Sequence, residues 1–202
     1  MSMMQKLVAV PLACAGAATV AAPASVAEPS ALHATGLATK KGPAQDTTKD
    51  APLLLATLAQ VHTGEHVVLD EESPTQQRFA ALLFDRVTGE EHLLDERLLA
   101  LLRNLAVLHR GAQIEIVSGY RSWKTNEVLR KKGHHVSAHS EHSLGNACDF
   151  RLVPVGSDRA LDPRAVERDM RGLGWSGGIG IYPGLDDWFV HADVGRNRRW
   201  EN

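Results

Sequence analysis

Hydrophobic side chains in the middle of the chain recur at helical spacing. Between Asp95 and Arg110 the leucines fall three or four residues apart, so they form one apolar stripe along a helix. Asp95 is suited to cap the first turn, and Gly111 is suited to end the helix. We interpret the stripe as core rather than as a cofactor site, because leucines at this spacing are what a buried helix face requires.

Other segments carry weaker helical signals. Ser122 can cap a helix over 122–132, and Asp162-Pro163 opens another over 162–172, since proline is favoured in the first turn. The apolar run 53–58 is interpreted as a short first helix. The stretch 75–86 has helical spacing, but a strand could occupy its end.

The remaining patterned segments are short and rich in branched or aromatic residues. They predict strands over 113–117, 147–153, 178–182 and 188–194, and a turn at 62–65 is expected to lead into 66–69. Helices dominate the first half, and strands mixed with helices follow. The expected fold class is therefore α+β.

Strand parity sorts the polar residues of the last strands. In 147–153, Cys148 shares its face with apolar neighbours, whereas Asp149 points to the other face. The same alternation puts His191 and Asp193 together on the polar face of the final strand. We therefore expect Asp149 and His191 to face a common site and Cys148 to lie in the core.

The first fifty residues do not resemble a folded domain. Residues 1–27 combine a basic start, an apolar run and small residues before a cleavage point after Ala27, which predicts a secretory signal peptide. Its removal would leave no membrane span, and Cys14 could be a lipid attachment site. Residues 28–50 are polar and unpatterned and are expected to be a flexible linker. The domain is expected to occupy 51–202.

Composition restricts the classes of function. The chain has 202 residues, with 44% hydrophobic and 23% charged residues, which is typical of one soluble domain. Its net charge is −2, with no basic stripe, so we do not expect nucleic-acid binding. Loss of Cys14 with the signal would leave Cys148 alone, and no internal disulfide could form.

Two histidines and one aspartate stand out as candidate metal ligands. His142 lies in a loop before the strand that carries Asp149, and His191 lies on the last strand. Two imidazoles and a carboxylate are a set that holds catalytic zinc and leaves one position open for water. Zinc lowers the pKa of such a water and polarises a carbonyl, which amide hydrolysis requires.

A longer frame surrounds these three residues. Its motifs are Ser118-Gly-Tyr-Arg-Ser122, Ser140-x-His142-x-x-Gly145-x-Ala147-x-Asp149, Gly178-x-Gly180-x-Tyr182-Pro, and Phe189-Val-His191-x-Asp193-x-Gly195 with Arg198 and Trp200. In order and spacing the frame resembles the M15 zinc peptidases, in particular their murein endopeptidase K group, from about Leu58 to Trp200. The resemblance implies the fold shared by D-Ala-D-Ala peptidases and the hedgehog domain, a small antiparallel sheet flanked by helices.

The resemblance also implies roles for individual residues. It places Zn²⁺ on His142, Asp149 and His191, and it implies that Arg121 reaches the substrate or steadies the oxyanion. Many relatives carry an acid or base two or three residues before the last histidine, where this chain has Trp188 and Phe189.

The general base therefore stays open among three residues. Asp193 is the first candidate, because it shares a face with His191, and support of that ligand is an equally good role for it. Asp187 and the loop residue His139 are the rivals.

The expected function is that of an exported zinc peptidase that cuts peptide cross-links of peptidoglycan in the periplasm or cell envelope. The cell-wall substrate, and a preference for cross-links that end at a diamino acid, are implied by the resemblance alone. Two alternatives stay open: a D,D- or L,D-carboxypeptidase that trims stem peptides, and a zinc-containing module that binds peptidoglycan without cutting it.

Overall fold

The computed structural model describes residues 54–133, 136–185 and 187–202, which belong to one compact unit. The predicted signal (1–27), linker (28–50) and lipid site at Cys14 lie outside the described residues. Within the described part of the chain, no helix is both long and apolar enough to cross a bilayer.

Seven strands form one sheet in the order β2-β1-β3-β4-β6-β5-β7. The β1–β3 and β5–β7 pairs are parallel and the other pairs are antiparallel. The expectation of a small antiparallel sheet is thus wrong, although the α+β class is confirmed. The strands are β1 (Ala56–Gln60), β2 (His66–Leu69), β3 (Gln113–Ser118), β4 (Ala147–Val153), β5 (Gly178–Pro183), β6 (Trp188–Asp193) and β7 (Arg198–Glu201).

Four α-helices and one 3₁₀ turn accompany the sheet. Asp95, Ser122 and Asp162 cap the predicted helices through their side chains, as the sequence signals indicated. The ambiguous stretch 75–86 contains a helix and no strand. The helices are α1 (Gln76–Leu82), α2 (Glu96–Leu108), α3 (Trp123–Lys131) and α4 (Pro163–Gly172), and the 3₁₀ turn is η1 (Glu141–Leu144).

The run at 53–58 does not form a helix. Its described part leads into β1, which pairs with both β2 and β3. Nearly all of β1 is buried, including Leu58 at 0% exposure. A strand covered on both faces has a continuous apolar sequence, and such a short run cannot be distinguished from a buried helix by periodicity.

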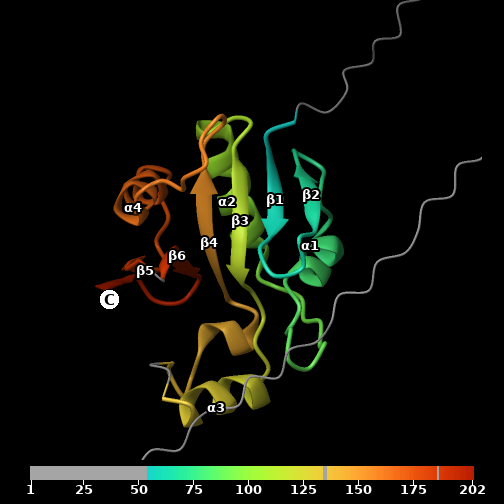
Figure 1. The fold of residues 1–202 in the computed structure, drawn as a ribbon, viewed down its shortest axis with the longest axis vertical. Coiled ribbons are helices and arrows are strands. Elements are labelled where there is room, and N and C mark those ends of the chain that lie inside the picture. The colour runs from blue at the N-terminus through green and yellow to red at the C-terminus, as the bar shows by residue number, and fades with distance from the viewer. Residues whose placement is uncertain (1–53, 134–135, 186) are drawn as a thin grey trace, which may run out of the picture. The chain divides into compact units, whose positions relative to one another are not determined.

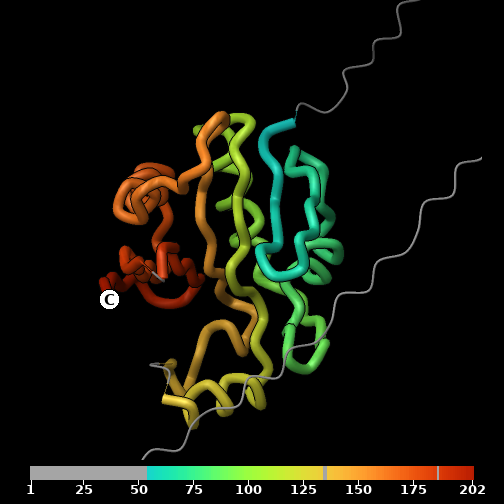
Figure 2. Tube along the Cα trace, in the orientation of Figure 1, coloured from blue at the N-terminus to red at the C-terminus, as the bar shows by residue number. Residues whose placement is uncertain are grey.

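The core lies between one face of the sheet and the helices. Ile114, Phe150, Val190 and the other alternate strand residues pack there against the leucine stripe of α2. Figure 1 shows α2 behind β3 and β4, with α3 beyond the end of the sheet to which β3 points. The trace in Figure 2 shows α3 and the segment that leads into β4 lying beyond one end of these two strands. Because the core covers only one face of the sheet, the polar residues on the opposite face are free to line a site.

Candidate metal centre

A row of neighbouring residues crosses five strands on the face opposite the core. Ser118 on β3 opposes Asp149 on β4, which opposes His191 on β6. His191 in turn opposes Gly180 on β5, and Gly180 opposes Trp200 on β7. Because directly opposed residues of adjacent strands project to the same side, this register brings the motifs of the long frame together.

His142 enters this row from η1. The turn ends at Gly145, whose φ of 72° is a left-handed conformation that glycine adopts without strain. The imidazole Nδ1 donates to the carbonyl oxygen of Gly119 at 2.7 Å, so Nε2 carries the free lone pair. Burial, followed by the charge of Arg121, lowers the pKa of His142 and keeps the ring neutral.

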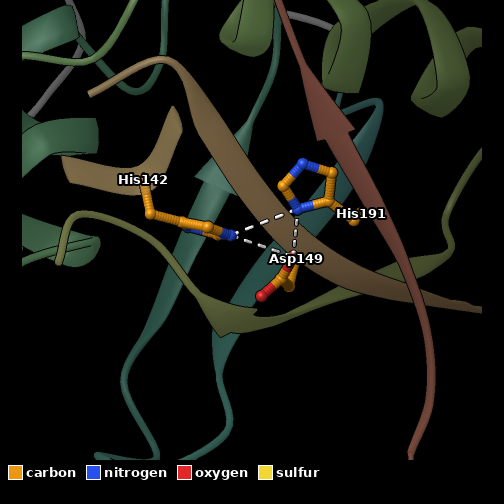
Figure 3. Close-up of side chains that lie close together, drawn as sticks. All are labelled: His142, Asp149 and His191. Atoms are coloured by element: carbon orange, nitrogen blue, oxygen red, sulfur yellow. Dashed lines mark hydrogen bonds and ion pairs between the residues drawn. The ribbon is translucent and has the colours of Figure 1, made fainter. Parts of the chain in front are cut away.

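Three donor atoms converge at the centre of the row. Asp149 Oδ1 lies 2.8 Å from His191 Nδ1 and 3.2 Å from His142 Nε2, and the two nitrogens are 3.2 Å apart. Figure 3 shows the three side chains directed at one another from different elements. Ligand atoms in a tetrahedral zinc site are about 3.3 Å apart, as bond lengths of about 2.0–2.1 Å require. The buried cluster therefore fits a metal ion, as the sequence predicted.

The charges in the cluster depend on one another. Burial alone would raise the pKa of Asp149, but the two neighbouring imidazoles hold it below its ordinary value. Burial would likewise lower the pKa of His191, yet hydrogen bonds to Asp149 and Asp193 raise it to about 9. In the metal-free protein, His191 therefore holds a proton between two carboxylates at neutral pH.

Asp193 lies on the far side of His191 from the cluster. Its Oδ2 is 3.1 Å from His191 Nε2 and accepts a hydrogen bond from Arg198 at 2.9 Å, while Oδ1 accepts one from the Gly195 amide. The residue is fully buried and does not line the cleft. This geometry does not suit the expected general base, because both oxygens are engaged away from the reacting centre. It suits the alternative role, support of the ligand.

Arg121 borders the cluster on the β3 side. Its Nη2 donates to Asp149 Oδ2 at 3.2 Å and to Ser118 Oγ at 3.1 Å.

The backbone that follows Arg121 is held in place by Asp85, a residue that the sequence analysis missed. Asp85 is 1% exposed, and its Oδ2 accepts from the amide of Ser122 at 2.8 Å. No motif identified it, because the contact depends on a loop 37 residues away.

A cleft of about 1040 Å³ opens over the cluster. His142, Asp149, His191 and Arg121 line it, together with the two rival bases Asp187 and His139. Its lining also includes Glu141, which the sequence analysis did not single out. Cys148 is fully buried in the core, as expected, and burial raises its thiol pKa.

Comparisons with known proteins relate most of the chain to one family. The family model described as peptidoglycan L,D-endopeptidase MepK, of the M15_2 peptidases, matches residues 51–200. The peptidoglycan L,D-endopeptidase MepK of Escherichia coli K12 is 30% identical over 174 residues, covering 83% of this chain and 91% of that protein. The probable peptidoglycan L,D-endopeptidase MepK of Haemophilus influenzae is 29% identical over 155 residues, covering 73% and 78%. No solved structure gave a significant match. The chain therefore belongs to the M15_2 peptidase family.

Proposed function

We propose that this protein is a zinc-dependent endopeptidase that hydrolyses peptide cross-links of peptidoglycan in the cell envelope. The observation that carries the proposal is the convergence of His142, Asp149 and His191 at the floor of a large cleft, in a chain of this family. The names of the relatives supply the substrate class. Export through the predicted signal at 1–27 and a fold relationship to D-Ala-D-Ala peptidases and the hedgehog domain are parts of the same proposal.

His142 would bind the metal through Nε2, His191 through Nδ1, and Asp149 through Oδ1. When bound there, zinc supplies Lewis-acid polarisation of the scissile carbonyl and an acidified water. The Gly119 carbonyl and the Asp193 carboxylate hold the outer nitrogens of the two rings, so each imidazole is fixed in tautomer and in direction.

Arg121 would act on the substrate from one side of the cluster. Hydrogen bonds to Asp149 and Ser118 already hold its guanidinium in one orientation. Little side-chain conformational entropy is therefore lost when substrate binds. A fixed positive group beside the reacting carbonyl stabilises the negative charge that develops on its oxygen.

The proton acceptor in this proposal is one of the cleft-lining groups His139, Glu141 and Asp187. Glu141 directly precedes the proposed ligand His142. Its Oε2 accepts a hydrogen bond from the side-chain amide of Asn146 at 3.1 Å. Replacement of each group by its uncharged analogue, with turnover measured across pH, identifies the one whose loss removes the acidic limb of the profile.

The proposal is tested with purified cross-linked muropeptide dimers, analysed by liquid chromatography and mass spectrometry. Release of monomers by the zinc-loaded protein is the expected result, and His142→Ala should abolish it. His109→Ala is the matched control, because His109 forms an imidazole–carboxylate pair with Asp169 (2.9 Å) outside the cleft. Loss of only a terminal residue would indicate a carboxypeptidase. Intact dimers would contradict a hydrolytic function and favour a binding module.

A further inference from the structure

Trp200 lies over β5 beside the metal cluster. Its ring centroid is 5.2 Å from that of His191, and Arg198 lies over its face at 5.2 Å. Gly180, opposite both residues in the sheet, makes this placement possible. A Cβ at position 180 would be 2.6 Å from indole atoms of Trp200, closer than real contacts allow.

The indole of Trp200 holds a tyrosine hydroxyl. Nε1 donates to the Tyr182 hydroxyl oxygen at 3.1 Å. An indole nitrogen can only donate, so the phenol must accept, and its own hydrogen remains to be donated. Among the described residues, none accepts a hydrogen bond from Tyr182.

The Tyr182 ring is part of the cleft wall. It stacks on Phe189 with centroids 4.4 Å apart, and both residues line the cleft with His191 and Trp200. In the sheet order, β5 lies on one side of the ligand-bearing strands and β3 on the other. Tyr182 and Arg121 therefore flank the cluster from opposite sides.

We propose that the Tyr182 hydroxyl donates a hydrogen bond to an acceptor oxygen of the bound peptide, and that Trp200 positions this hydroxyl. The inference rests on the proposed function, because it takes the occupant of the cleft to be a peptidoglycan stem. Burial raises the pKa of Tyr182, which keeps the hydroxyl protonated at working pH. Trp200 acts through Tyr182 and is a positioning residue.

Tyr182→Phe tests the donor while it retains the stacked ring. We expect kcat/KM on cross-linked dimers to fall about tenfold or more, the usual effect of one lost hydrogen bond to substrate. The zinc content should be unchanged. As a measurement independent of turnover, the Kd of the zinc-loaded protein for a tripeptide stem ending in the diamino acid should rise by a similar factor.

Trp200→Phe tests the positioning role through a double-mutant cycle. It should lower kcat/KM in the wild-type background and have little further effect beside Tyr182→Phe. Trp188→Phe is the matched control, since the Trp188 indole donates to the Leu161 carbonyl outside the cleft (3.0 Å). Additive losses would show that Trp200 acts by another route and would overturn the positioning role.

The outcomes separate this inference from the proposed function. A wild-type protein that releases no monomers contradicts the function, and the stem-binding comparison still tests Tyr182. A loss in kcat/KM or in stem affinity, with zinc content unchanged, supports the donor role. Tyr182→Phe with both quantities within about twofold of wild type overturns it.

Discussion

If Asp193 supports His191 rather than acting as the general base, as its geometry favours, one substitution should separate the two roles. Asp193→Asn retains one oxygen and replaces the other with an NH₂ donor. In the wild type both oxygens accept hydrogen bonds, from Gly195 on one side and from His191 and Arg198 on the other. In the variant, a donor must therefore face a donor in a site that is fully buried.

The expected consequence is weaker metal binding with intact chemistry. Loss of an outer partner of a metal-bound imidazole typically lowers metal affinity about 10- to 100-fold, or about 1.4–2.7 kcal/mol. Turnover should fall at limiting zinc and return to within a few-fold of wild type at saturating zinc. A general base would instead supply about 10²- to 10⁴-fold of the rate, which added zinc cannot restore.

The assay pairs two measurements on one preparation. Competition with a chromophoric chelator gives the zinc affinity, and dimer cleavage at saturating zinc gives kcat. Asp169→Asn is the matched control, because Asp169 is the carboxylate partner of His109 outside the cleft, and it should change neither quantity. A variant that binds zinc as tightly as wild type but does not turn over would refute the supporting role.

Three further predictions concern stability and packing. Asp85→Ala should lower the free energy of unfolding by about 3 kcal/mol in urea titrations, because the charged carboxylate of Asp85 accepts hydrogen bonds from the backbone amides of Val87 and Ser122. In wild type, this contribution is present above the ordinary aspartate pKa and is lost as the pH falls, since the folded-state pKa is depressed. For the metal-free protein, the stabilisation from protonated His191 is complete below pH 6.5 and lost as the pH rises through about 9. The urea midpoint of the metal-free protein should therefore decrease as the pH rises from 7 to 9.5, and it should decrease more than that of the zinc-loaded protein. Equal decreases in the two forms would contradict this. Gly180→Ala should displace Trp200 and shift tryptophan fluorescence, and an unchanged spectrum would count against the close packing.

Local signals in the sequence predicted the helices that begin at a capping side chain and the strand whose residues alternate clearly. The capped helices begin where Asp95, Ser122 and Asp162 indicated, and β4 has the predicted bounds. Parity also placed Asp149 and His191 on one face, because alternation along a strand is a local property.

What depends on tertiary contacts could not be predicted in the same way. Strand β7 was missed, since its charged residues show no apolar alternation and it is defined by pairing with β5. Parity grouped Asp193 with His191, but only the packed structure shows which ring nitrogen each carboxylate faces. The Tyr182–Trp200 hydrogen bond could not be predicted either, because it joins residues of different strands.

The central claim is that the His142, Asp149 and His191 cluster holds the metal on which cross-link hydrolysis depends. The most direct test is zinc add-back, with dimer cleavage followed by mass spectrometry in chelator-treated protein. We predict no cleavage without metal, recovery with about one equivalent of zinc in wild type, and no recovery in Asp149→Ala. Full cleavage by the metal-free protein, or by the zinc-treated Asp149→Ala variant, would contradict the account.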